Sequence, residues 1–228
     1  LDGKTLTGQV QKLDKMSING VLVTPEVQYR KIDDTTAEYV MTVRNDDEFI
    51  NADITVKLQL VGNEMHFDVT KVVNKNNVEM GKPVDNVRKL IQTIEFPGNT
   101  LVSVGSNKQN AKFDGAQMST NTHRAGDYHL DLKTVKMNDY AYGFMYGFVS
   151  SNELAASVWS NSQFTYQGND FARITTALQR VDGVNYIGIQ SSPYWYQRAY
   201  KNLVFPEYTL ELPSSKVVIT KDLNKDNV

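Results

Sequence analysis

The sequence contains no cysteine among its 228 residues, which excludes disulfide bonds, thiolate metal sites and thiol catalysis. It also has no apolar run of the ~18 residues that a membrane-spanning helix needs, so no membrane insertion is expected in this segment. A net charge of −2 gives no electrostatic attraction for nucleic acid or for an acidic membrane surface. The missing disulfides do not decide the compartment, because a large core can stabilise an extracellular protein without them.

The common catalytic motifs are missing as well. The sequence has no Gly-rich phosphate loop, no nucleophile elbow and no zincin helix. Of its three histidines, His66 lies in an alternating segment, where a lone histidine is usually structural, and His123 and His129 do not have a metal-ligand spacing. Glycoside hydrolysis usually needs two positioned carboxylates, and nothing in the order of the 26 acidic residues selects a pair. The residues therefore identify no catalytic group.

Apolar and polar residues alternate along most of the chain, which predicts β-strands. The dipeptides Gly62-Asn63 and Asp182-Gly183 predict tight turns between such segments. With at most one or two short helices, this pattern predicts an all-β fold, a large β-sandwich. The expected strands are 37–43, 52–60, 65–69, 90–96, 101–104, 128–135, 140–149, 174–181, 186–190, 208–212 and 216–220.

Two segments depart from the alternating pattern. Ser150 and Glu153 have capping-box spacing, which predicts a short helix over 154–159. The polar stretch 106–124 has no clear period, so we expect an extended surface loop there.

Two groups of aromatic residues stand out. The first alternates with small or flexible residues over 140–148, which favours a buried sheet face over a platform for stacking sugar rings. The second is Tyr194-Trp195-Tyr196. Consecutive strand residues point to opposite faces, so we expect at least one of these rings to be exposed, at a glycan-binding site or at an interface with a neighbouring domain.

The last seven residues have the spacing of the first half of an EF-hand-type calcium loop. Asp222, Asn224 and Asp226 supply side-chain oxygens at positions 1, 3 and 5, and the carbonyl of Val228 falls at position 7. The acidic ligand of position 12 would lie beyond Val228, so we interpret the chain as a piece of a larger protein. The alternative is a solvated polar tail, because Asp, Asn and Lys are common in disordered chain ends.

The same C-terminal region carries a family resemblance. Segments 203–208 and 217–228 read Leu-Val-Phe-Pro-Glu-Tyr and Val-Val-Ile-Thr-Lys-Asp-Leu-Asn-Lys-Asp-Asn-Val. They resemble the segment that leads into the catalytic barrel of bacterial endo-α-N-acetylgalactosaminidases, glycoside hydrolase family 101. The resemblance implies a galactose mutarotase-like β-supersandwich over 1–220, with the calcium loop beginning at 221–228, at the junction with a (β/α)8 barrel.

Members of this family release the disaccharide Gal-β-1,3-GalNAc from Ser or Thr of mucin-type O-glycoproteins, as secreted or cell-wall-anchored enzymes. Because their catalytic carboxylates lie in the barrel, the resemblance implies a noncatalytic domain here. Its partners would be the barrel of the same chain and O-glycoprotein glycans. What it transfers to this sequence is the calcium loop, formed by Asp222, Asn224, Asp226 and Val228.

Two other hypotheses remain open. One is a carbohydrate-binding module that holds glycans through Tyr194, Trp195 or Tyr196. The other is a free-standing sugar mutarotase or epimerase, which we disfavour because no histidine–carboxylate pair stands at a motif-matched position.

Overall fold

The computed structural model describes residues 15–79, 81–95, 99–118, 125–131, 146–151, 154–161, 174–191, 194–200, 203–209 and 211–221. The described residues confirm an all-β fold, in which every strand pairing is antiparallel. Within these ranges the one helix is the 3-10 turn η1 (Val87–Lys89). None of the described helical residues forms a helix long and apolar enough to cross a membrane.

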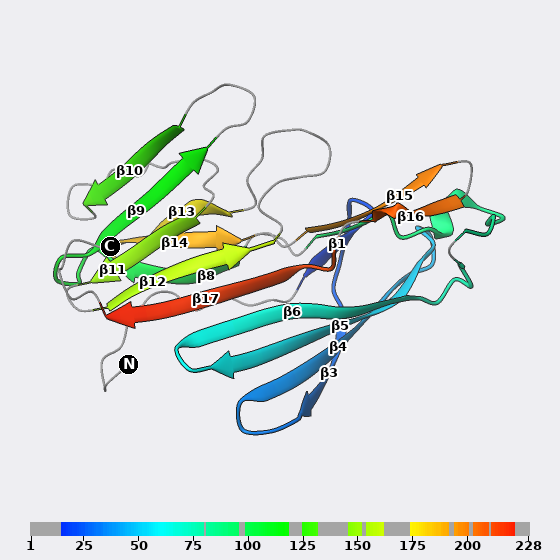
Figure 1. The fold of residues 1–228 in the computed structure, drawn as a ribbon, viewed down its shortest axis with the longest axis horizontal. Coiled ribbons are helices and arrows are strands. Elements are labelled where there is room, and N and C mark those ends of the chain that lie inside the picture. Colours follow the sequence, from blue (N-terminus) through cyan, green and yellow to red (C-terminus); the bar gives the residue numbers. More distant parts are fainter. Residues whose placement is uncertain are drawn as a thin grey trace.

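Three sheets make up the fold (Figure 1). A nine-stranded sheet has the order β10 (Ala125–Asp131), β9 (Lys112–Met118), β11 (Tyr146–Ser151), β12 (Leu154–Ser160), β17 (Ser214–Lys221), β6 (Glu64–Asn74), β5 (Ile50–Val61), β4 (Thr36–Asn45), β3 (Glu26–Lys31). A five-stranded sheet has the order β16 (Leu203–Thr209), β15 (Tyr194–Tyr200), β7 (Thr93–Glu95), β1 (Met16–Ile18), β2 (Val21–Val23). The third sheet contains β13 (Ile174–Val181), β14 (Val184–Ser191) and β8 (Asn99–Gly105).

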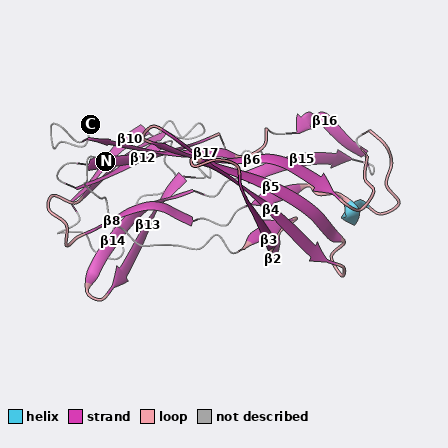
Figure 2. Cartoon of the chain, turned by 90° about the horizontal axis from the view of Figure 1, so that it is seen from below, coloured by secondary structure: helices cyan, strands magenta, loops and turns pink. Residues whose placement is uncertain are grey.

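One face of the nine-stranded sheet carries the core. Along β5, Ile54 and Val56 are at most 1% exposed, while the residues between and beside them are half-exposed. They pack in one cluster with Ile18 of β1 and Ile94 of β7, which belong to the five-stranded sheet. At the other end, β8 and β14 of the three-stranded sheet lie against β11 and β12 (Figure 2). The large sheet is therefore the layer that both smaller sheets cover.

Tight turns follow the predicted dipeptides. Val61 pairs with Glu64 across Gly62-Asn63, with Gly62 at φ +59°. Val181 pairs with Val184 across Asp182-Gly183, both at positive φ, which is the type I′ geometry that matches strand twist. The predicted strand at 208–212 is wrong in its bounds, because β16 ends at Thr209 and β17 begins at Ser214.

The predicted helix at 154–159 is wrong, because these residues form β12. They pair with β11 on one side and β17 on the other. Ala155 and Ala156 are both buried and, as consecutive strand residues, lie on opposite faces of the sheet. The helix preference of Leu-Ala-Ala amounts to a few tenths of a kcal/mol per residue, and two ladders of backbone hydrogen bonds outweigh it.

The predicted loop over 106–124 is also wrong in part, because 112–118 form β9. This strand pairs with β10 and β11, and Phe113 is fully buried. The local signal is only the alternation of Ala111 and Phe113, which is too short to recognise in a polar stretch.

Strand β17 joins the two parts of the nine-stranded sheet. It pairs with β6 on one edge and with β12 on the other, as the red strand in Figure 1 shows. Ser214 Oγ donates to Asp68 Oδ1 at 2.5 Å, and Lys216 Nζ lies 3.0 Å from Glu64 Oε1. Glu64 Oε2 is also 2.7 Å from His66 Nε2, two residues further along β6.

These contacts give the seam between β6 and β17 a pH dependence. The Lys216 ammonium, and then the His66 ring, lower the pKa of the Glu64 carboxyl below its usual value. A carboxylate whose pKa is lower in the folded than in the unfolded state stabilises the fold above the unfolded pKa of about 4.3, and this contribution is lost as the pH falls through the lowered value.

We therefore expect the melting temperature to fall as the pH is lowered from about 6 to below 4, with part of that fall due to Glu64. The variant Glu64→Gln should melt lower than the wild type at neutral pH and lose less on acidification. Thermal unfolding followed by circular dichroism measures both. The variant Glu26→Gln, on the exposed edge strand β3, is the control. Parallel pH profiles for wild type and Glu64→Gln would contradict this assignment.

Candidate functional site

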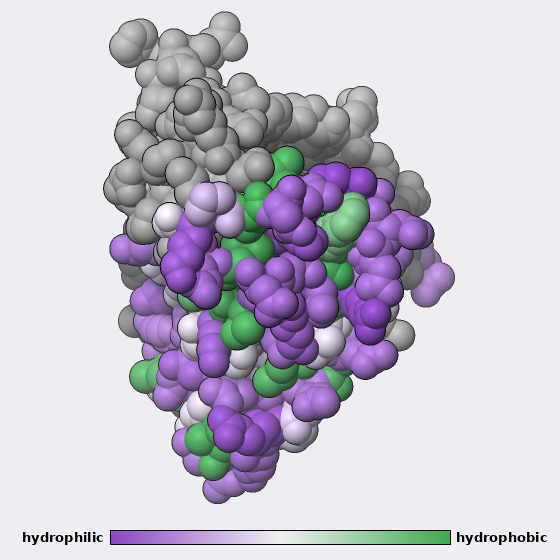
Figure 3. Space-filling model, turned by 90° about the vertical axis from the view of Figure 1, so that its right-hand side faces the viewer, coloured by the Kyte–Doolittle hydropathy of each residue, from purple (hydrophilic) through white to green (hydrophobic). Residues whose placement is uncertain are grey.

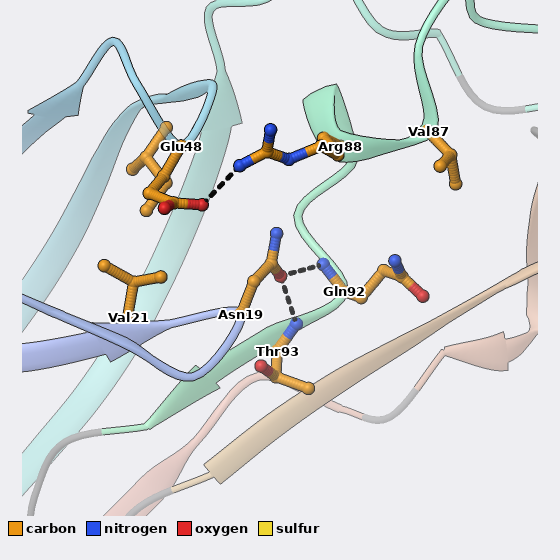
Figure 4. Close-up of a pocket in the computed structure, with 8 residues that line it drawn as sticks. Asn19, Val21, Glu48, Val87, Arg88, Gln92 and Thr93 are labelled. Carbon is orange, nitrogen blue, oxygen red and sulfur yellow. Dashed lines mark hydrogen bonds and ion pairs between the residues drawn. The ribbon is translucent and has the colours of Figure 1, made fainter.

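An open cleft of about 410 Å³ lies where the β1–β2 turn meets η1 and the start of β7 (Figure 4). Its polar wall consists of Asn19, Glu48, Arg88, Gln92 and Thr93. Its apolar wall consists of Val21, Ile50 and Val87. Figure 3 views this end of the molecule, where apolar residues lie among a mainly hydrophilic surface.

Asn19 fixes the floor of the cleft. Asn19 and Gly20 connect β1 to β2 with φ values of 51° and 81°, a type I′ turn that favours Asn-Gly. Asn19 Oδ1 accepts hydrogen bonds from the backbone N–H groups of Gln92 and Thr93, at 2.7 and 3.1 Å. Its Nδ2 donates to the Leu90 carbonyl at 2.8 Å. One side chain thus holds the β1–β2 turn against the segment that forms the opposite wall.

Arg88 and Glu48 form the charged side of the cleft. Arg88 Nη2 lies 2.6 Å from Glu48 Oε2, and the guanidinium carbon is 5.1 Å from the centre of the Phe49 ring. The two charged side chains are 51% and 42% exposed, so the pair contributes little to stability. Asn86 Oδ1 accepts from the Arg88 N–H at 3.0 Å and so caps η1, which positions the arginine.

The cleft has the chemistry of a binding site for a polar ligand. It presents a guanidinium, a carboxylate, two amides and a hydroxyl beside three aliphatic side chains, which suits a hydroxylated molecule with an apolar face. Glu48 is the one carboxylate among the residues that line it. Hydrolysis of a glycoside by a pair of carboxylates is therefore not supported by this cleft.

The predicted aromatic cluster lies on the strand next to the cleft. In the pairing of β15 with β7, Tyr194 is opposite Glu95, Trp195 is opposite Ile94 and Tyr196 is opposite Thr93. Since Thr93 lines the cleft, the register brings position 196 next to its wall. The sequence reasoning identified these aromatics but missed the cleft, whose walls come from segments some 70 residues apart, such as Asn19 and Gln92.

The predicted calcium ligands Asp222, Asn224, Asp226 and Val228 lie outside the described residues, which end at Lys221. In the described part of the chain, no group of three or more His, Asp or Glu side chains is arranged to hold a metal ion. The calcium loop therefore stays a prediction.

The remaining predicted residues have different positions. His66 faces Glu64, a carboxylate that sequence reasoning missed although residues two apart on a strand share a face. Neither residue lines the cleft. His129 lies in β10 opposite Asp114, and His123 is outside the described residues. Of the predicted aromatic stripe over 140–148, residues 140–145 are outside the described residues. At its end, Phe148 is half-buried, whereas its non-aromatic neighbour Val149 is fully buried.

The hydrogen bonds of Asn19 can be tested without disturbing the turn. Glycine adopts the same positive φ without strain, so Asn19→Gly removes only the side-chain contacts. We expect a loss of about 1–3 kcal/mol in the free energy of unfolding, because two N–H groups and a carbonyl lose their partners. Urea denaturation measures the loss.

The matched control is Asn77→Gly. Asn77 has a φ of 56° and an exposed position, and the structure gives this residue no side-chain hydrogen bond. Its replacement should change stability by about 0.5 kcal/mol or less. Equal losses in the two variants would show that Asn19 acts through its backbone alone.

Comparison with known proteins identifies the family. A family model for the galactose mutarotase-like fold domain matches residues 1–228. A Renibacterium salmoninarum protein, provisionally named as an endo-α-N-acetylgalactosaminidase, is 24% identical over 233 residues. That match covers 98% of this chain and 14% of the relative.

Solved structures overlap less closely. Two α-galactosidases of family GH36 from Geobacillus stearothermophilus, AgaA and AgaB, overlap with TM-scores of 0.41 and 0.40, each at 8% identity. The overlaps cover 93% and 95% of this chain, and 30% and 31% of those chains. The match over the whole chain to the family model, together with the antiparallel sheets, shows that this chain belongs to the galactose mutarotase-like fold domain family.

Proposed function

We propose that this chain is the noncatalytic β-supersandwich domain of an endo-α-N-acetylgalactosaminidase that releases Gal-β-1,3-GalNAc from Ser or Thr of mucin-type O-glycoproteins. The observation that carries the proposal is the similarity of 98% of the chain to 14% of a relative bearing that activity in its name. Because the relative is about seven times longer than this chain, other domains of such a protein have room for the chemistry.

In this proposal the domain holds a catalytic barrel of the same chain. The parent enzyme is secreted and anchored to the cell wall, where it meets O-glycoprotein glycans. The role of this domain would be to support the barrel rigidly, because catalytic carboxylates must stay within a fraction of an ångström of their productive positions.

Hydrolysis of a chromogenic α-glycoside of Gal-β-1,3-GalNAc tests the division of labour. We expect release of the chromophore by a chain extended through the following several hundred residues and none by the 228-residue chain, because both carboxylates lie downstream. The 228-residue chain mixed with a separately expressed barrel is the control. Hydrolysis by the 228-residue chain alone would overturn the proposal.

A calcium site at the junction is the second part of the proposal. Asp222, Asn224 and Asp226 offer hard oxygen ligands at alternate positions directly after β17, and the Val228 carbonyl adds a fourth. This donor set fits calcium and not a soft transition metal. When bound, the ion would crosslink the end of β17 to the following segment, so that its binding energy becomes folding energy.

Calcium should therefore raise the melting temperature of a chain extended through the loop. At a calcium concentration about 100 times the dissociation constant, the free energy of unfolding should increase by about 2.7 kcal/mol. Asp222→Ala and Asp226→Ala should abolish the shift, whereas Lys225→Ala, which alters a non-ligand position of the same loop, should preserve it. Calorimetry with calcium and with magnesium measures this. No shift at saturating calcium would contradict the site.

Glycan binding is a second candidate function, favoured by the register of β15 next to the cleft. Position 196 pairs with Thr93, so the aromatic segment and the polar wall are neighbours. An aromatic ring for the C–H face of a sugar, beside groups that hydrogen-bond its hydroxyls, is a common basis of carbohydrate recognition.

Tryptophan fluorescence can report such binding, because the chain has only two tryptophans. In Trp159→Phe, Trp195 is the one remaining reporter, and we expect saturable quenching by Gal-β-1,3-GalNAc. Adding Gln92→Ala should weaken binding about tenfold, the effect of losing about 1.4 kcal/mol of hydrogen bonding. A flat titration would eliminate glycan binding and leave the support function.

A further inference from the structure

An apolar patch remains uncovered at the tips of the two long hairpins of the nine-stranded sheet. It consists of Tyr29, Tyr39, Leu58, Leu60 and Met65, which we name the hairpin-tip patch. Tyr29, Leu60 and Met65 are 60%, 55% and 36% exposed. The Tyr29 and Tyr39 rings are in contact, with centroids 5.3 Å apart. A hollow of about 240 Å³ lies over this patch and is bordered by Lys31, Asp33 and Asp34.

The patch is a continuation of the buried core face. Along β5, Ile54 and Val56 are covered by the five-stranded sheet, Leu58 is half-buried and Leu60 is exposed, all on one face. Across the sheet, Leu60 pairs with Met65, which pairs in turn with Val217 of β17, and Val217 is only 4% exposed. An apolar sheet face that extends past the sheet packed on it is typical of an interaction surface.

The turns around the patch are held in place. The Leu60 N–H donates to the Thr35 carbonyl at 2.8 Å, and the Ile32 N–H donates to the Thr36 carbonyl at 2.9 Å. The first bond ties the β3–β4 turn to β5, and the second closes the turn itself. The surface is thus formed in advance, which reduces the entropy cost of docking.

The second half of the last described strand, β17, passes next to the patch. Asn63, in the β5–β6 turn, donates from Nδ2 to the Ile219 carbonyl at 2.6 Å, and its own carbonyl accepts from the Ile219 N–H at 3.0 Å. Strand β17 ends at Lys221, four positions along the chain from Val217, which lies opposite Met65 of the patch. A domain tethered there by a short linker would meet the patch at a high effective concentration.

We propose that the hairpin-tip patch is the surface on which the domain following β17 in the parent protein docks, with an apolar contact over Leu60 and Met65. This inference rests on the proposed function, which places a barrel after this domain. Pairing with a second copy of this chain through the edge of the sheet is disfavoured. The adjacent edge strand β3 carries Glu26, Arg30 and Lys31, and such charges oppose pairing between edges.

Cysteine labelling tests the inference, since the chain has no cysteine of its own. Leu60→Cys places a thiol in the patch. Leu22→Cys, in β2 of the five-stranded sheet, is the matched control, because Leu22 is 56% exposed and Leu60 55%. Each variant is labelled with a maleimide, both in the 228-residue chain and in the extended chain.

We expect Leu60→Cys to react rapidly in the 228-residue chain and at least about tenfold more slowly in the extended chain, where the open state is a minor population. Leu22→Cys should react at the same rate in both. Equal rates for Leu60→Cys in the two chains would overturn the inference. Slower labelling of Leu22→Cys instead of Leu60→Cys in the extended chain would also overturn it. So would labelling of Leu60→Cys in the 228-residue chain that slows as the protein concentration rises, because that would indicate docking of a second copy.

Hydrolysis by the same extended chain separates this failure from that of the proposed function. An extended chain that hydrolyses the disaccharide glycoside but leaves Leu60→Cys unprotected overturns the docking surface alone. An extended chain that is folded and inactive overturns the proposed function and, with it, this inference.

Discussion

The pairing of β17 with both β6 and β12 is the interaction on which the rest of the structure depends. Without β17, the meander β3–β6 and the group β9–β12 share no strand edge, since no other described pairing joins them. The seam combines two backbone ladders with Lys216–Glu64, Ser214–Asp68 and a hydrogen bond between Ser215 and Ser160, both of which are buried. Closing it brings together residues about 150 positions apart, so the seam contributes stability only after both parts have formed.

In the proposed function, a domain that follows β17 would be attached to the strand that joins the two parts of the large sheet. A load or a metal ion placed just after Lys221 acts on the strand that holds the whole sheet together. The candidate cleft lies near the other end of the long strands, formed by the β1–β2 turn, η1 and β7. A glycan bound in the cleft would thus lie away from β17 and from the attachment point. Substitutions in one region could then leave the other unchanged.

Much of the fold follows from the sequence, because alternation along 37–43, 52–60 and 65–69 dictates half-buried strands, and Gly62-Asn63 dictates the turn between two of them. Failures occur where local preference and tertiary pairing disagree, as in β12, or where the apolar signal is two residues long, as before Phe113. The cleft could not be predicted, because Asn19 is joined to Gln92 and Thr93 only by the folded chain. The His66–Glu64 contact could have been found from its spacing of two.

Native-state hydrogen exchange of the β17 amides tests the central claim most directly. If β17 joins the sheet, the amides that bond β17 to β6 and to β12 should exchange only through global unfolding, with the same free energy as the central amides of β5 and the same dependence on denaturant. Exchange of the β17 amides at a much lower free energy, while β4–β6 remain protected, would contradict it. The two parts of the sheet would then be separate units held side by side.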